Sequence, residues 1–212
     1  MVIDGGYDLV LDVGANNGQF GKELRAFGYR DRIVSFEPLA IAHARLTSTA
    51  CNDDKWMVAP RGALGAARGT ANIYISGLQA SSSLLTMAAR HHEAAPGSAT
   101  IGQEHVEVET IDRLGPALAH GCSKVFLKID TQGFELEVLK GAEDMLSRID
   151  CVLLELSLVE LYAGQPLWRE VSAWIEARGF TMTGLNQAFI DPTSFRTLQI
   201  DGIFTRVDNQ PS

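Results

Sequence analysis

The sequence feature that most constrains the fold is a regular alternation of short apolar runs with amphipathic stretches along the 212 residues. Apolar runs such as Tyr7–Val13 and Cys151–Leu156 have strand length and predict strands that are buried on both sides. The stretches between them, such as Asn16–Phe27 and Glu135–Leu146, are predicted to be helices. Strands that alternate with helices predict a doubly wound α/β fold, in which helices cover both faces of a mostly parallel sheet.

One segment interrupts this alternation. Gly77–Gly102 is rich in Ser, Ala and His and has little periodicity. Loops of that length inside a compact domain are usually lids or binding loops. We therefore expect a single domain over residues 1–212, with an irregular lid or substrate loop at about 77–102.

The charge balance bears on the partners of this chain. It has 18 Lys and Arg against 26 Asp and Glu, a net charge of −8, and no basic run that could follow a phosphate backbone. No apolar stretch reaches the roughly 20 residues that span a bilayer, and the start lacks the basic and apolar regions of a signal peptide. The composition therefore predicts a cytoplasmic protein without a nucleic-acid partner or a membrane span.

The ends of the first two strands carry the first functional signal. Gly14 and Gly18 let the backbone approach a ligand closely, and the following helix begins with free N–H groups that suit an anionic group. Glu37 ends the second strand, where a carboxylate can accept two hydrogen bonds from a ribose diol. These features leave a nicotinamide oxidoreductase and a methyltransferase open. The dinucleotide fingerprint requires a glycine where this chain has Asn16, whereas Asp12 before Gly14 matches the first motif of class I methyltransferases.

Further motifs along the chain resemble one methyltransferase family. They occur in this order: Asp12–Phe20 (DVGANNGQF), Phe36–Pro38 (FEP), Ala63–Gly65 (ALG), Ser81–Leu85 (SSSLL), Thr110–Asp112 (TID), Leu127–Glu135 (LKIDTQGFE) and Val138–Ala142 (VLKGA). Together they resemble the FkbM family of class I O-methyltransferases, which use S-adenosylmethionine. The resemblance extends from about Leu9 to Leu156 and implies a seven-stranded, Rossmann-like, mostly parallel sheet with one antiparallel strand.

The resemblance also implies roles for individual residues. The methionine part of the cofactor is expected at Asp12 and the loop from Gly14 to Gly18, its ribose at Glu37, and its adenine at Ala63 and Leu64. The full set of expected cofactor-binding residues is Asp12, Gly14, Ala15, Asn16, Gly18, Phe20, Glu37, Pro38, Ala63, Leu64, Ser82 and Asp130. The expected acceptor is a hydroxyl of a sugar, an oligosaccharide or a glycolipid. A polyketide-like hydroxyl is the alternative, and Gln132 stands where many relatives carry Glu.

Methylation of a hydroxyl requires a general base, or a metal that lowers the pKa of the hydroxyl. Asp130 and Glu155 end the fourth and fifth strands, which should be neighbours, so the two carboxylates could share Mg²⁺ with the acceptor. Alternatively, Asp130 acts as the base or contacts the cofactor. His91 and His92 in the long loop are further candidate bases, since a histidine titrates near neutral pH.

Two tryptophans complete the set of residues that we single out. Trp168 and Trp174 lie at helical spacing, which is typical of core residues or of a homodimer contact. Tyr162 and Trp168 are further candidates for lining the acceptor cleft. A homodimer therefore remains an open alternative to a monomer.

Overall fold

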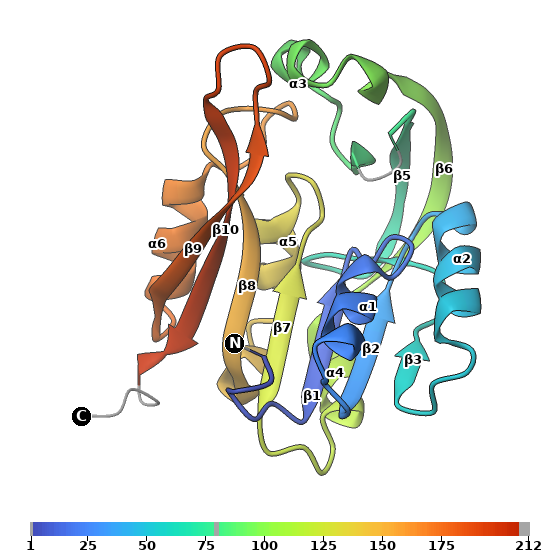
Figure 1. Ribbon diagram of the computed structural model, residues 1–212, viewed down its shortest axis with the longest axis vertical. Coiled ribbons are helices and arrows are strands. Elements are labelled where there is room, and N and C mark those ends of the chain that lie inside the picture. The colour runs from blue at the N-terminus through green and yellow to red at the C-terminus, as the bar shows by residue number, and fades with distance from the viewer. Residues whose placement is uncertain (1, 79–80, 208–212) are drawn as a thin grey trace.

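The computed structural model describes residues 2–78 and 81–207, which contain a seven-stranded sheet of the order β3-β2-β1-β7-β8-β10-β9 (Figure 1). In that order the strands are β3 (Trp56–Val58), β2 (Arg32–Phe36), β1 (Leu9–Val13), β7 (Val125–Ile129), β8 (Ile149–Ser157), β10 (Thr197–Arg206) and β9 (Phe180–Ile190). β10 runs antiparallel to both of its neighbours, whereas the pairs from β3 to β8 are all parallel. This arrangement confirms the predicted fold class, a mostly parallel sheet with one antiparallel strand.

Helices pack on both faces of this sheet because its strands are apolar on both sides. Val10 of β1 shares one buried cluster with Leu24 and Leu46, which belong to α1 (Gln19–Ala26) and α2 (Ala40–Ala50). Leu9 and Leu11 point to the opposite face, where the cluster includes residues of α4 (Ile111–Leu118), α5 (Glu135–Lys140) and α6 (Trp168–Glu176). None of the helices in the described part of the chain is long and apolar enough to cross a membrane.

A second, smaller sheet follows β3 in the chain. It has the order β4-β6-β5, with β4 (Ala63–Leu64) parallel and β5 (Gly69–Ser76) antiparallel to β6 (Thr100–Glu109). It packs through Ile73 and Val106 against Ala42 of α2. The sequence indicated strands within this region but not that they form a sheet of their own.

The prediction of an irregular segment at Gly77–Gly102 is wrong in part. This segment contains α3 (Ala89–Ala94), a 3₁₀ turn (Pro96–Ser98) and the beginning of β6. The helix is held by packing of Ala94 against Leu161 and Tyr162, and its six residues are too few to show a helical period in the sequence. That the segment acts as a lid stays a prediction.

The helix that the sequence predicts over Glu135–Leu146 is also interrupted. α5 ends at Lys140, and a separate 3₁₀ turn covers Met145–Arg148. At Gly141 the chain passes so close to the backbone of Gly65 that a β-carbon would collide with its oxygen. The break therefore follows from a contact with the small sheet, which the local periodicity does not reveal.

Candidate active site

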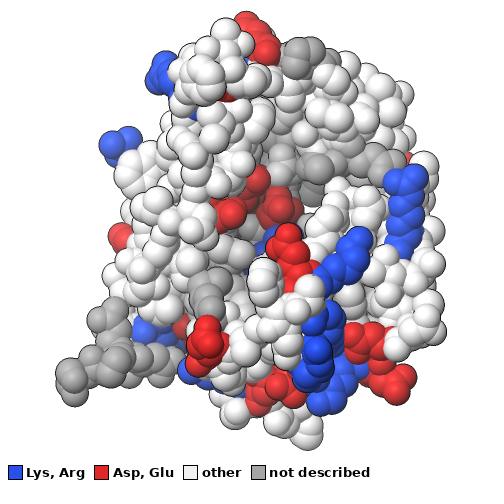
Figure 2. All heavy atoms as spheres, viewed as in Figure 1, with Lys and Arg blue, Asp and Glu red and all other residues white. Residues whose placement is uncertain are grey.

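A cleft of about 860 Å³ opens where the carboxyl ends of β1 and β7 meet. The chain proceeds from β1 to β2 and β3 on one side and continues with β7 and β8 on the other, so the strand order reverses at this point. Such a switch point is the general ligand site of doubly wound sheets. Figure 2 shows acidic side chains gathered around the hollow in the middle of this face.

The loop after β1 forms one wall of the cleft. Gly14 has a φ of +73°, and a β-carbon there would collide with the backbone oxygen of Asp130, so only glycine fits. The N–H groups of Gly14 and Ala15 donate to the Phe36 carbonyl at 3.1 and 3.0 Å. These bonds fix the loop against the end of β2 and keep its backbone beside the cleft.

Glu37 is the buried carboxylate at the end of β2, with only 4% of its surface exposed. Its Oε1 accepts from the Leu39 N–H at 2.9 Å, and its Oε2 accepts from the Asn16 N–H at 2.8 Å. Burial raises the pKa of Glu37, although these two N–H groups favour its charged form. Each carboxylate oxygen keeps a second lone pair, so Glu37 can still accept from a diol in the cleft.

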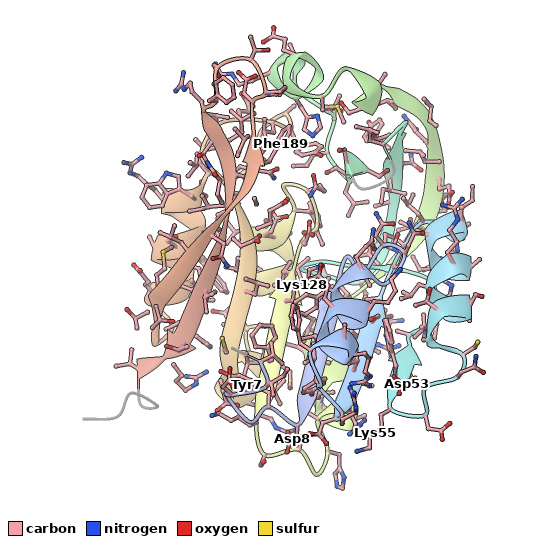
Figure 3. The ribbon with its side chains drawn as sticks, in the orientation of Figure 1. Tyr7, Asp8, Asp53, Lys55, Lys128 and Phe189 are labelled. Carbon is pink, nitrogen blue, oxygen red and sulfur yellow. The ribbon has the colours of Figure 1, made fainter. Side chains whose placement is uncertain are left out.

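Lys128 is a central residue that our sequence analysis missed. Its Nζ lies 3.1 Å from Oδ1 of Asp12 and 3.5 Å from Oδ2 of Asp130, and it donates to the Gly14 carbonyl at 3.0 Å (Figure 3). Burial alone would lower the pKa of Lys128, but the two carboxylates outweigh this effect and raise it. The available signal was a lone charge within the apolar strand Val125–Ile129, since a buried lysine requires partners.

Asp12 lies beneath the loop rather than in the cleft. It is fully buried, pairs with Lys128, and accepts from the Ser35 hydroxyl at 3.1 Å. The Trp56 indole N–H in turn donates to Ser35 at 3.0 Å. Asp12 therefore supports the loop through Lys128, and a direct contact with the cofactor does not follow from its position.

Of the other expected cofactor-binding residues, Gly18 lies outside the cleft and the rest line it. Gly18 forms the N-cap of α1 and lies against Leu46 and Trp56, away from the cleft. The expected residues that do line the cleft are Gly14, Ala15, Asn16, Phe20, Glu37, Pro38, Ala63, Leu64, Ser82 and Asp130. These lining residues come from segments that are up to 116 positions apart, from Gly14 to Asp130.

Asp130, directly after β7, and Glu155, within the last three residues of β8, are joined by a glutamine. The Gln132 side-chain N–H₂ donates to Oδ1 of Asp130 at 2.9 Å and to Oε2 of Glu155 at 2.6 Å. Gln199 of β10 also donates to Oε2 of Glu155, at 2.8 Å. The sequence placed both carboxylates at neighbouring strand ends, but it did not identify Gln132 or Gln199 as the groups between them.

The acidic side chains at this end of the cleft repel one another. Burial raises the pKa of Glu155 well above its ordinary value, and the carboxylates of Asp130, Glu135 and Asp201 raise it further. Asp201 of β10 stands directly opposite Glu155, and burial likewise raises its pKa. Like charges at opposed positions of a sheet destabilise it, so their presence in a cleft indicates a functional site.

His91, one of the two candidate histidines, does not line this cleft. His91 is 2% exposed, its Nδ1 lies 3.0 Å from the Ser98 hydroxyl, and its Nε2 lies 3.3 Å from the Tyr162 hydroxyl. α3 carries both histidines, and the side chain of His92 lies outside the described part of the structure. His91 was expected as a candidate base in an irregular loop, but it belongs to α3, which folds its ring inward against Tyr162 and away from the cleft lining.

Comparison with known proteins decides between the two classes of enzyme that the sequence left open. The family model of the methyltransferase FkbM domain matches residues 12–182. The chain belongs to the FkbM methyltransferase family. This match identifies it as a methyltransferase domain and excludes the nicotinamide oxidoreductase. Among curated proteins, none matches the sequence.

Solved structures agree with this FkbM assignment at the level of the fold. Magnesium protoporphyrin IX methyltransferase from Synechocystis, with bound S-adenosylmethionine, is 12% identical over 97% of this chain and 74% of its own, with a TM-score of 0.50. Fibrillarin from Aeropyrum pernix, with natively bound S-adenosylmethionine, is 11% identical over 93% of this chain and 66% of its own, also with a TM-score of 0.50. A protein of the NADB-Rossmann superfamily from Streptococcus agalactiae is 11% identical over 98% of this chain and 65% of its own, with a TM-score of 0.51. The FkbM chain thus spans 65% to 74% of the lengths of these structures.

The acidic end of the FkbM cleft does not fit the expected Mg²⁺. Among residues 2–78 and 81–207, no three His, Cys, Asp or Glu side chains lie together as metal ligands. Between Asp130 and Glu155 stand the N–H₂ donors of Gln132, and the Lys128 ammonium lies beside Asp130. Divalent cations bind oxygen ligands, and donors that point at the same carboxylates compete with them.

Proposed function

We propose that this chain transfers a methyl group from S-adenosylmethionine to a hydroxyl of a neutral sugar-type acceptor. The observation that carries this proposal is the position of Glu155. This carboxylate, with its raised pKa, lines the same cleft as the Gly14 loop and Glu37. A carboxylate whose pKa is raised is a stronger base and is better suited to removing a proton from a hydroxyl.

The cleft has the parts that the cofactor requires. Glu37 can accept from the ribose diol, and the small apolar side chains of Ala63 and Leu64 offer a surface for a flat ring. The N–H end of α1 lies beside the Gly14 loop, where a carboxylate is favoured. Two structural neighbours, the Synechocystis and Aeropyrum methyltransferase-fold proteins, bind S-adenosylmethionine and support the same choice.

The reaction assigns a task to each residue at the acidic end. The bound cofactor supplies a methyl group on a positively charged sulfur. The acceptor oxygen bonds to this methyl carbon as the carbon–sulfur bond breaks, and the electron pair remains on sulfur. Glu155 takes the hydroxyl proton through Oε1, because Gln132 and Gln199 both donate to Oε2. The ammonium group of Lys128 stabilises the charged form of Asp130, so Glu155 rather than Asp130 receives the proton of the acceptor hydroxyl.

The charges around the cleft favour a neutral acceptor. Its lining carries several carboxylates, whereas Lys128 is its one cation among the described residues and is already paired with Asp12 and Asp130. The lining acids are Asp4, Glu23, Glu37, Asp130, Glu155 and Asp201. A phosphate or carboxylate group on the acceptor would be repelled there, whereas sugar hydroxyls can donate to carboxylates.

A specific observation favours the second candidate, an apolar hydroxyl compound of the polyketide kind. Phe27 and Ile3 line the cleft and are 77% and 41% exposed, next to Phe20 and Leu153. An exposed apolar rim beside a polar floor suits an acceptor with a hydrophobic body. The rim favours acceptors with an apolar part, which include glycolipids, over a plain oligosaccharide.

The test combines binding with turnover. We expect S-adenosylmethionine and S-adenosylhomocysteine to bind in calorimetry, and labelled methyl to reach neutral oligosaccharides or glycolipids but not their phosphorylated forms. Glu155→Gln should lose turnover at least 100-fold while cofactor affinity stays within about threefold. EDTA should leave the rate unchanged. Preferred methylation of an apolar polyketide hydroxyl would select the second candidate, and full activity of Glu155→Gln would contradict the assignment of the base.

A further inference from the structure

The orientation of the Gln132 amide decides whether Asp130 and Glu155 each receive a hydrogen bond. An amide group can rotate by half a turn, which exchanges its N–H₂ and its carbonyl oxygen. With the N–H₂ toward Asp130 and Glu155, each carboxylate receives a hydrogen bond. The rotated amide would direct its carbonyl oxygen at both carboxylates, which would repel it. The carboxylates therefore favour the first orientation, and a donor to the carbonyl oxygen on the far side of Gln132 would add a second selection for it.

Tyr162 provides that selection. Its hydroxyl donates to Oε1 of Gln132 at 2.8 Å, so the carbonyl oxygen has a partner only when the N–H₂ faces the carboxylates. Tyr162 is fully buried, so it touches Gln132 from behind rather than from the cleft. Burial and the nearby carboxylates raise the pKa of Tyr162, and the phenol therefore stays protonated as a donor.

The surroundings of Tyr162 direct its proton toward Gln132. The Ser81 carbonyl at 3.0 Å can only accept, and it shares the hydroxyl hydrogen with Gln132. His91 places its Nε2 at 3.3 Å from the same hydroxyl, and its ring contacts the rings of Tyr162 and Phe189. The tautomer of His91 sets the direction of that contact, whereas Oε1 of Gln132, at 2.8 Å, is the nearest of the three partners of the hydroxyl.

The backbone of Gln132 is fixed as firmly as its side chain. Its φ is +57°, a left-handed conformation that a residue with a β-carbon rarely adopts. The Ser83 hydroxyl donates to the Gln132 carbonyl at 2.6 Å, and the Leu85 N–H donates to Ser83 at 3.0 Å. Strained residues that their surroundings hold in place concentrate at functional sites.

We propose that Tyr162 is a positioning residue, which acts through Gln132 to hold Asp130 and Glu155 in one fixed arrangement. It touches neither the cofactor region nor the acceptor region. This arrangement leaves Oε1 of Glu155 facing the acceptor, and that consequence for proton transfer rests on the proposed function. The segment that contains α3 then contributes to the active site through His91 and Tyr162, without reaching into the cleft.

The direct test observes the Gln132 side-chain amide in the protein without ligands. In two-dimensional ¹⁵N–¹H spectra we expect two Gln132 side-chain signals that exchange slowly with water, identified by their loss in Gln132→Leu. In Tyr162→Phe, which keeps the ring and removes only the hydroxyl, their exchange with water should become at least tenfold faster. Unchanged signals in Tyr162→Phe would overturn the proposal.

The matched control is Tyr29→Phe. Tyr29 is also a buried tyrosine, and its hydroxyl donates to a backbone carbonyl, that of Arg32 at 3.2 Å, at a distance from the cleft. It should lose comparable thermal stability and leave the Gln132 signals unchanged. If both variants alter these signals equally, loss of stability explains the effect and the positioning role is wrong.

A second measurement separates this inference from the proposed function. Once an acceptor is known, Tyr162→Phe should lower kcat at least tenfold and leave the KM for S-adenosylmethionine within about threefold. An unchanged kcat would contradict the positioning role. If the unaltered protein methylates no acceptor, the proposed function fails, whereas the amide spectra still decide whether Tyr162 holds Gln132.

Discussion

At the scale of single residues, Glu37 shows how one carboxylate serves both the fold and the site. Its two oxygens accept from the N–H groups of Asn16 and Leu39, which join the Gly14 loop to the start of α2. Hydrogen bonds to a charged acceptor contribute about 1.5–3 kcal/mol each. The same carboxylate lines the cleft, so a ligand diol would add to bonds that already exist.

We expect Glu37→Ala to weaken the binding of S-adenosylmethionine at least tenfold, because the ribose loses a charged acceptor. Isothermal titration calorimetry measures this effect, and circular dichroism checks that the variant is folded. The matched control is Glu104→Ala, since Glu104 accepts from the Ala40 N–H at 3.0 Å and from Arg61 at 3.0 Å without lining the cleft. Equal affinity in the folded Glu37 variant would remove Glu37 from the site.

The residues that sequence reasoning placed correctly are those at strand ends. Asp130 follows one apolar run and Glu155 lies near the end of the next, so their proximity follows from the parallel pairing of β7 and β8. The contacts that sequence reasoning missed join distant segments. Tyr162 meets Gln132 across 30 positions and His91 across 71, and no local pattern encodes such pairs.

At the scale of elements, the turn between β7 and α5 is built around Glu135. One oxygen of this buried carboxylate accepts from the Thr131 N–H at 2.9 Å, the Thr131 hydroxyl at 3.2 Å and the Gly133 N–H at 3.1 Å. Burial outweighs these donors and raises the pKa of Glu135 from 4.5 to about 7. The turn that carries Asp130 and Gln132 therefore becomes costly to keep folded when Glu135 ionises.

This predicts a stability that depends on pH. The folded protein holds the Glu135 proton more tightly than the unfolded chain, so its contribution is complete below pH 4.5 and is lost as the pH rises through 7. The loss amounts to ~3 kcal/mol. Glu135→Gln keeps an oxygen acceptor without the charge, so its free energy of unfolding should rise relative to the unaltered protein between pH 4.5 and 8, as measured with urea.

The matched control for this prediction is Glu137→Gln. Glu137 lies in the same helix and pairs with Lys140 at 2.6 Å on the surface. Its variant should keep the pH dependence of the unaltered protein. If Glu135→Gln shows that same dependence, ionisation of Glu135 does not limit the stability of the turn.

The elements that the sequence predicted best are those with strong periodicity, such as β1, α1 and β8. The errors fall where tertiary contacts decide the local structure. α3 is a six-residue helix that is held by Tyr162 and Leu161, and α5 ends because Gly141 approaches Gly65. Neither contact leaves a trace in the residues nearby, so periodicity could not find them.

At the scale of the whole molecule, the cleft joins the main sheet to the small one. The Gly14 loop and Glu37 follow strands of the main sheet, whereas Ala63 and Leu64 form β4 of the small sheet. Of the twelve cofactor-binding residues that the family resemblance implied, ten line the cleft, whereas Asp12 and Gly18 do not. The sequence could not predict that a separate sheet supplies the apolar wall, because the parallel pairing of β4 with β6 joins segments 45 positions apart.

A ligand that touches both sheets should stabilise the molecule as a unit. S-adenosylhomocysteine at 100 times its dissociation constant contributes ~2.7 kcal/mol. For a domain of this size the corresponding rise in Tm is roughly 5–10 °C. Thermal unfolding should show this rise with S-adenosylhomocysteine and none with NAD, since the loop has Asn16 where dinucleotide enzymes need glycine.

The same ligand should slow hydrogen exchange at residues 14–20 and at residues 62–64 together. Protection of the first segment alone would show that the small sheet takes no part in binding, and a larger rise with NAD would contradict the cofactor assignment.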